Sequence, residues 1–151
     1  MSTHVLEREQ LVRRPRGEVF PFFADAANLE RITPEFLHFR VLTPLPIAMR
    51  PGAIIDYRLR LFGVAFNWRT VIESFEPEMR FVDVQARGPY RLWRHVHDFI
   101  EAPGGTLVRD RIEYEVPLGL LGEVARRAFV DRTLARIFDD RRERIAAAFG
   151  A

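Results

Sequence analysis

Cysteine is absent from this chain of 151 residues, and so is lysine. Without cysteine the protein can form no disulfide, no thiolate metal site and no cysteine nucleophile, a composition that fits a reducing compartment. The apolar runs are far shorter than the roughly 18 residues that a membrane span requires, and the N-terminus carries no signal-peptide hydrophobic region. We therefore expect a soluble, cytoplasmic protein with no membrane span.

Because lysine is absent, all 23 basic residues are arginine, and 21 acidic residues leave a formal net charge of +2. The isoelectric point is high partly because arginine titrates so far up the scale. The arginines are interleaved with acidic residues and form no long basic block. A dispersed distribution of this kind argues against nucleic-acid binding, so we predict no nucleic-acid partner.

The pattern of residues indicates one continuous domain over residues 1–151, since no repeat, low-complexity tract or linker interrupts it. An extended strand is predicted over Thr3–Val12. Two short helical segments follow, Glu18–Asp25 with its phenylalanine-rich face and Asn28–Arg31, which ends before a Thr-Pro pair.

From His38 onward the apolar period changes to two, which predicts consecutive strands joined as antiparallel hairpins. The predicted strands are His38–Thr43, Ile54–Phe62, Val64–Phe75, Arg80–Ala86, Tyr90–Glu101 and Thr106–Val116. After Pro117 a long helix runs to about residue 149, and its apolar stripe consists of Leu120, Val124, Leu134, Phe138, Ile145 and Phe149. Because this helix must bury its stripe against the sheet, the fold class is α+β.

Charged residues of the helix have simple structural explanations. Arg127 and Asp131 stand four residues apart, so they either gate the mouth of a pocket or form an i,i+4 ion pair, and we expect the ion pair. Arg141, Arg142 and Arg144 near the helix C-terminus suit the helix dipole and need no partner.

Pairing arithmetic predicts which side chains face inward. A two-residue turn at Gly104-Gly105 places Trp93 opposite Val116, His95 opposite Tyr114, His97 opposite Ile112 and Phe99 opposite Asp110. On the outer face of this hairpin Arg94 pairs with Glu115 and Asp98 with Arg111, and such pairs of opposite charge are typical of a solvent-exposed face. A turn at Phe62-Gly63 pairs Tyr57 with Trp68, Leu59 with Phe66 and Asp56 with Arg69. The next loop opposes Ile72 to Asp83 and Thr70 to Gln85.

This inward face is unusual because aromatic side chains alternate with polar ones. A buried polar group without a partner costs about 1–3 kcal/mol, so these groups either satisfy one another or line a wet cavity. Aromatic walls with a few convergent polar groups are typical of a small-molecule site. The candidate ligand-binding residues are Tyr57, Leu59, Phe66, Trp68, Phe81, Asp83, Gln85, Trp93, His95, His97, Asp110, Ile112, Tyr114, Leu134 and Phe138.

Two stretches resemble a known family. The segment from Pro15 through Glu18-Val19-Phe20 to Ile32-Thr33-Pro34 resembles the opening signature of the START-like superfamily, also called SRPBCC. The stretch from Phe81 to Phe99 is similar to a bacterial ligand-binding subgroup related to polyketide cyclase/dehydratase-like proteins. The resemblance covers nearly the whole chain and implies a helix-grip fold, with a curved antiparallel sheet around a long C-terminal helix and a deep cavity between them. It is specific for fold alone, because the superfamily hosts binding, transport and catalysis.

The spacing His95-x-His97 places two imidazoles on one side of a strand, where they could chelate a metal with Asp110 or Asp83 as third ligand. The sequence fixes no third ligand, so we predict no metal and no cofactor. The imidazoles would instead bond Tyr114, Asp83, water or a ligand.

We predict that the protein binds a small hydrophobic or aromatic molecule. The alternative is a polyketide cyclase/dehydratase-type enzyme, in which His95 and Asp83 form a general acid–base pair and Tyr114 or Tyr57 stabilises an enolate. A third class is a protein-interaction or stress-related module. The oligomeric state stays open between monomer and homodimer.

Overall fold

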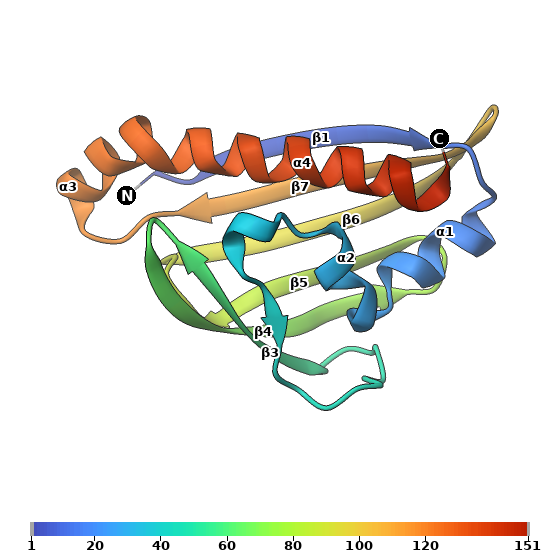
Figure 1. The fold of residues 1–151 in the computed structure, drawn as a ribbon, viewed down its shortest axis with the longest axis horizontal. Helices are drawn as coiled ribbons and strands as arrows, with labels where there is room; N and C mark the ends of the chain where they lie inside the picture. The colour runs from blue at the N-terminus through green and yellow to red at the C-terminus, as the bar shows by residue number, and fades with distance from the viewer. Residues whose placement is uncertain (1, 151) are drawn as a thin grey trace.

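A curved antiparallel sheet of seven strands follows one side of the long C-terminal helix in the computed structural model, which describes residues 2–150 (Figure 1). The strands lie in the order β1-β7-β6-β5-β4-β3-β2. They are β1 (His4–Val12), β2 (Arg40–Val41), β3 (Ile54–Leu61), β4 (Val64–Glu76), β5 (Arg80–Arg87), β6 (Leu92–Ala102) and β7 (Gly105–Glu115). The α+β helix-grip prediction is therefore confirmed.

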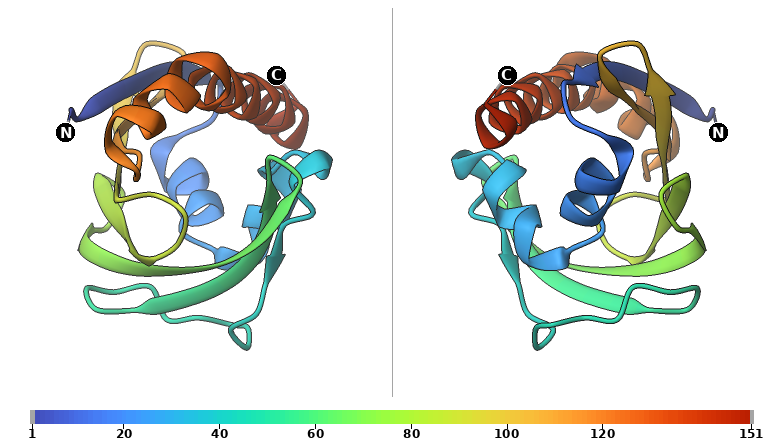
Figure 2. Two further views of the ribbon diagram at one scale, coloured as in Figure 1. Left: turned by 90° about the vertical axis from the view of Figure 1, so that its left-hand side faces the viewer. Right: turned by 90° about the vertical axis from the view of Figure 1, so that its right-hand side faces the viewer.

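Helical segments stand on the concave side of this sheet (Figure 2). They are α1 (Arg16–Phe23), α2 (Leu29–Ile32), α3 (Gly119–Ala125) and α4 (Asp131–Phe149), with 3-10 turns at Ala26–Asn28 and Glu35–Leu37. A π-helical turn, Arg126–Val130, joins α3 to α4. Helix α1 begins two residues earlier than predicted because Pro15 stands at its N-cap and leaves Pro21 inside the helix.

The β3–β4 and β4–β5 registers are confirmed: Tyr57 pairs with Trp68, and Ile72 with Asp83. The turn at Phe62-Gly63 has positive φ at both residues, as a two-residue hairpin turn requires. On the outer face Arg69 forms two hydrogen bonds to Asp56.

The predicted β6–β7 register is wrong by two residues. Ala102 pairs with Gly105, so Pro103 and Gly104 form the turn, and His97 lies opposite Asp110. Proline suits the first central position of a type II turn, and Gly104, with φ of 87°, suits the second. Because the shift is even, every side chain keeps its face. The outer pairs change, so that Arg94 faces Glu113 and Asp98 faces Arg109.

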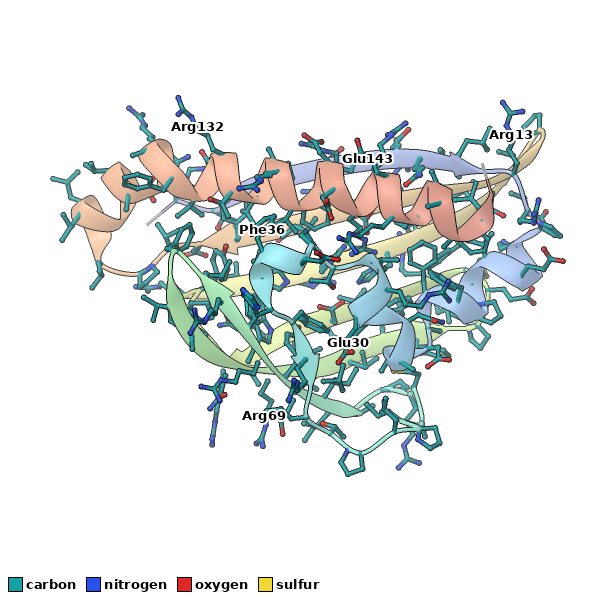
Figure 3. The ribbon with its side chains drawn as sticks, in the orientation of Figure 1. Arg13, Glu30, Phe36, Arg69, Arg132 and Glu143 are labelled. Atoms are coloured by element: carbon teal, nitrogen blue, oxygen red, sulfur yellow. The ribbon has the colours of Figure 1, made fainter. Side chains whose placement is uncertain are left out.

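The C-terminal helix buries only the later part of its predicted stripe. Leu134, Phe138 and Ile145 are buried, whereas Leu120 and Val124 are exposed. The π-helical turn between the two groups adds a residue, which rotates α3 by roughly 100° about the helix axis relative to α4. The outer face of α4 carries charge, including Arg132 and Glu143 (Figure 3).

Candidate functional site

A cavity of about 170 Å³ lies between the concave face of the sheet and helix α4. Its wall is mainly apolar and aromatic, with contributions from α1, α2, α4 and strands β3 to β6. For comparison, an apolar cavity of about 150 Å³ in a protein core accommodates benzene. The cavity is thus large enough for a molecule of one small ring system.

Ten of the fifteen predicted ligand-binding residues line this cavity. They are Tyr57, Leu59, Trp68, Phe81, Asp83, Trp93, His95, His97, Leu134 and Phe138. Strand alternation predicts eight of these residues, which lie on β3 to β6 with their side chains on the concave face. The apolar stripe of the helix predicts the other two, Leu134 and Phe138 of α4.

The other five lie outside the cavity lining. Helix α4 runs along β1 and β7, so Ile112, Tyr114 and Asp110 of β7 are buried beside it rather than in the cavity wall. Gln85 is engaged with the backbone of Tyr90, its Nε2 donating to the carbonyl at 2.7 Å and its Oε1 accepting from the amide at 3.1 Å. Phe66 is partly buried and packs against the apolar cluster that contains Trp68.

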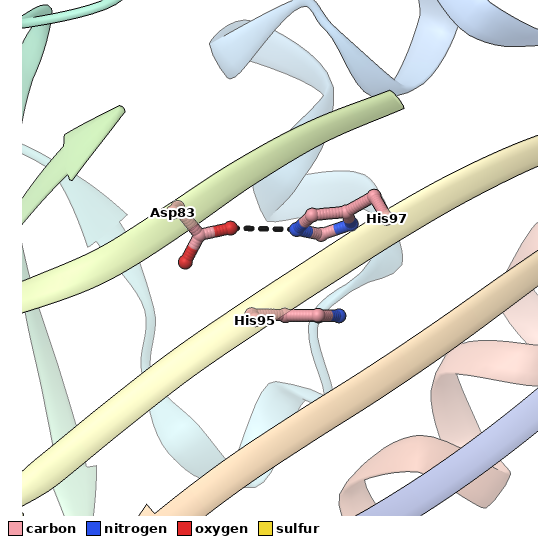
Figure 4. Close-up of side chains that lie close together, drawn as sticks. All are labelled: Asp83, His95 and His97. Carbon is pink, nitrogen blue, oxygen red and sulfur yellow. Dashed lines mark hydrogen bonds and ion pairs between the residues drawn. The ribbon is translucent and has the colours of Figure 1, made fainter. Parts of the chain in front are cut away.

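The predicted pairing of His95 with Asp83 is wrong. Their backbones are opposite on β5 and β6, yet the side chains pair diagonally. His97 Nε2 lies 2.6 Å from Oδ2 of Asp83 (Figure 4), and His95 Nε2 lies 2.7 Å from Oδ1 of Asp110. The two imidazole rings stack with their centroids 3.7 Å apart. The site therefore contains two parallel histidine–carboxylate pairs.

Arg141 of α4 also lines the cavity, and its Nη2 lies 3.6 Å from Oδ1 of Asp110. The prediction that Arg141 needs no partner is therefore wrong. Its spacing from Leu134 and Phe138, seven and three residues, places it on the same helix face, and this signal could have found it. Arg142 and Arg144 also have partners, the carbonyl of Glu9 and the carboxylate of Asp140.

Both buried carboxylates stay ionised near neutral pH. Burial opposes ionisation most strongly, but the hydrogen bond of His97 and the charge that His97 acquires at low pH outweigh it, with help from His95 and Arg141, so the pKa of Asp83 lies below its ordinary value. At Asp110 burial is again the largest influence, and the Arg141 charge with the His95 hydrogen bond lowers the pKa well below its usual range. An ionised carboxylate only accepts hydrogen bonds, so each histidine donates from Nε2.

His97 is neutral near physiological pH. Burial, followed by the nearby charge of His95, lowers the pKa of His97 to about 4, although Asp83 and Asp110 act in the opposite direction. Its Nδ1 is buried and has no hydrogen-bond partner among residues 2–150. In the neutral ring this atom carries the lone pair, which explains why it makes no bond to Asp110 Oδ1 at 3.5 Å.

Asp83, His95 and His97 each offer one metal-ligating atom, and these three atoms lie within 4.8 Å of one another. In the structure the Nε2 atoms of both histidines are engaged with carboxylates, and the rings are nearly parallel, at 23°. Nearly parallel rings direct their lone pairs side by side instead of toward one point. The arrangement therefore suits a hydrogen-bonded network.

Two tyrosines were candidates for stabilising an enolate. Tyr114 donates to Asp131 at 2.7 Å, and Asp131 in turn pairs with Arg126 rather than with the predicted Arg127. Tyr57 lines the cavity, and its hydroxyl lies 2.7 Å from Oγ1 of Thr70. Burial, then the charge of Asp83, raises the pKa of Tyr57 above its ordinary value, so it remains a neutral phenol.

A curved sheet gripping a C-terminal helix over a partly polar cavity defines a START-like protein. Residues 12–140 match the family model described as polyketide cyclase/dehydrase and lipid transport, and the chain belongs to this family. No curated protein matches the chain. No helix within residues 2–150 is long and apolar enough to cross a membrane.

Solved structures share the fold at low sequence identity. The Zhui aromatase/cyclase from Streptomyces sp. R1128 has a TM-score of 0.76 at 12% identity, over 99% of this chain and 94% of that one. TTHA0849 from Thermus thermophilus has a TM-score of 0.74 at 18% identity, over 96% and 99%. Ara h 8.0201 has a TM-score of 0.61 at 12% identity, over 97% and 99%.

Proposed function

We propose that the protein binds a small hydrophobic or aromatic molecule in the cavity between the sheet and α4. The observation that carries this proposal is an aromatic-walled cavity of about 170 Å³ in which a buried polar cluster occupies one part of the wall. Cavities with apolar walls and a few convergent polar groups are the usual form of a small-molecule site.

The wall indicates the chemistry of the ligand. Trp68, Trp93 and Tyr90 offer ring faces and edges to an apolar or aromatic body. Asp83 and His97 offer polar atoms to one hydroxyl or carbonyl group. A molecule with one polar end therefore matches the cavity better than a pure hydrocarbon.

Isothermal titration with 2-naphthol and with indole tests the proposal. Leu134→Trp fills the cavity from α4 and should weaken binding at least about tenfold, a loss of roughly 1.4 kcal/mol. Ala147→Trp, at an exposed position of the same helix, should leave affinity within about twofold. If the wild type binds neither probe, or if both variants behave alike while remaining folded, the proposal fails.

Catalysis of the cyclase/dehydratase type is a second candidate, favoured by the two histidine–carboxylate pairs. In this mechanism Asp110 accepts from Nε2 of His95, so Nδ1 is the nitrogen that acts as the base. That nitrogen would take the proton α to a carbonyl and then give the same proton to the departing hydroxyl, so that water leaves and the ring is restored. This mechanism gives Asp110, not Asp83, the role of orienting His95.

Dehydration of 4-hydroxy-4-phenylbutan-2-one to the conjugated enone, followed by absorbance, tests this second candidate. If His95 is catalytic, His95→Ala abolishes turnover while 2-naphthol still binds. Parallel losses of turnover and binding leave His95 only a binding role, and absence of turnover in the wild type leaves this substrate class unsupported.

A further inference from the structure

The five most exposed large hydrophobic side chains of the described residues lie in one segment of the C-terminal helix. Their exposed fractions run from 61% to 84%. We call this set the α3 apolar patch; it consists of Leu118, Leu120, Leu121, Val124 and Phe129. Single exposed apolar residues are common, but a contiguous group of this kind marks an interaction surface.

The local backbone holds this patch outward. Leu118 adopts a left-handed conformation, with φ of 71°, directly before α3. A side chain on Gly122 would collide with the carbonyl oxygen of Pro117, so the strand-to-helix connection packs closely on this glycine. The leucines beside it consequently point to solvent, and the π-helical turn keeps them out of the stripe that α4 buries.

A second apolar group lies at the same end of the molecule. Phe62 and Val64 at the tip of the β3–β4 hairpin are about half exposed, at 51% and 53%. Figure 1 shows α3 and this hairpin tip at one end, and the left view of Figure 2 shows them on opposite sides of that end. Two separated apolar groups at one end of the molecule suit a broad, flat apolar surface better than a single inserted peptide.

The charges around these projections are positive. Arg60, Arg127 and Arg132 are exposed near the two apolar groups. The acidic residues of this helix segment, Glu123 and Asp131, are engaged by Arg126 at 2.8 Å and 2.6 Å. Apolar side chains flanked by arginine are typical of segments that lie in the interface of anionic membranes. Two copies of this chain placed face to face would bring like charges together, which disfavours self-association.

We propose that this end of the protein docks on the surface of an anionic lipid bilayer. The α3 apolar patch and the hairpin tip enter the headgroup region, and the flanking arginines contact acidic headgroups. The docked end continues into the cavity wall, because Leu61 next to Phe62 and Leu134 one turn after Val130 both line the cavity. The bilayer would thus lie beside the site without any part of the chain crossing it.

Co-sedimentation with vesicles tests this proposal. The wild type should pellet with vesicles of mixed phosphatidylcholine and phosphatidylglycerol, and less with phosphatidylcholine alone or in high salt. The double variant L120S/L121S should lose at least about tenfold in partitioning. The control L42S/L45S removes two exposed leucines from the loop before β3, away from this end, and should bind like the wild type.

Arg127→Gln should weaken binding to the mixed vesicles and reduce its salt dependence, while the thermal unfolding temperature stays unchanged. Failure of the wild type to bind mixed vesicles overturns the proposal. It is also overturned if sedimentation velocity shows a dimer that L120S/L121S dissociates, because the surface would then bind a second copy. Binding of 2-naphthol measured without lipid is independent of either result.

Discussion

Nε2 of His95 donates to Oδ1 of Asp110 at 2.7 Å, although only the histidine lines the cavity. The same oxygen lies 3.6 Å from Nη2 of Arg141, so a carboxylate outside the cavity holds two polar residues of its wall. All three side chains are nearly or fully buried, which strengthens their electrostatic interaction. The polarity of the cavity therefore depends on a group that no ligand in the cavity touches.

Asp110→Ala should destabilise the protein by roughly 3–5 kcal/mol, because it leaves the Arg141 charge buried without its partner. Asp98→Ala is the matched control. Its carboxylate pairs with the half-exposed Arg80, and losing such a pair costs about 0–1 kcal/mol. Urea unfolding at neutral pH measures both. Equal costs for the two substitutions would contradict the role given to Asp110.

The stability of the protein should fall as the pH drops from about 6.5 to about 4. A histidine in the unfolded chain takes up its proton near 6.5, whereas burial lowers the pKa of His97 in the fold to about 4. Between these values the unfolded state binds more protons, so the free energy of unfolding decreases by up to about 1.4 kcal/mol per pH unit.

Urea unfolding of the wild type and of His97→Gln across this range checks the assignment. The variant keeps a donor toward Asp83 but cannot titrate, so its stability should change less with pH. His38→Asn, at an exposed position, should leave the pH dependence as in the wild type. If the free energy of unfolding of His97→Gln falls with pH as steeply as that of the wild type, another group takes up the proton.

Gly105→Ala should destabilise the β6–β7 hairpin more than Gly104→Ala. A side chain on Gly105 would collide with the backbone carbonyl of Val12 at the end of the neighbouring strand β1, whereas one on Gly104 meets open space. Both glycines have positive φ, so an alanine at either position strains the backbone. The difference between the two variants therefore measures mainly the collision at Gly105. The difference in thermal stability should correspond to about 1–3 kcal/mol. Equal effects would mean that the chain at Val12 moves away freely.

Leu134→Ala should enlarge the cavity from the α4 side. Leu134 is buried and belongs to the largest apolar cluster, so truncation should cost about 2–5 kcal/mol. The variant should gain affinity for a larger probe, 1-pyrenol, relative to 2-naphthol in isothermal titration. An unchanged preference would indicate that neighbouring side chains collapse into the space.

Hydrophobic periodicity and turn chemistry predict most of the fold. A positive-φ turn at Phe62-Gly63 sets one register, and strand alternation then places eight of the predicted residues around the cavity. The β6–β7 register differs because three consecutive residues, Pro103 to Gly105, allow two positions for the turn, and proline's fixed φ decides between them.

Side-chain direction is not encoded in the strand pattern. His95 has Asp83 as its backbone neighbour, but it leans toward Asp110 because ionised Asp110 and Arg141 are packed there by α4. The spacing of Arg141 from Leu134 and Phe138 could have placed it on the buried helix face, but its carboxylate partner, Asp110 on β7, is set by the packing of α4 and not by the sequence pattern. The π-helical turn, which exposes Leu120 and Val124, has no signature in the apolar period.

Native mass spectrometry of the purified protein measures directly whether a small hydrophobic molecule binds in the cavity. We expect a complex heavier than the polypeptide by one small organic molecule, or one formed on adding 2-naphthol, and its loss in Leu134→Trp but not in Ala147→Trp. A wild-type spectrum that shows the bare polypeptide alone, with and without added 2-naphthol, would contradict it.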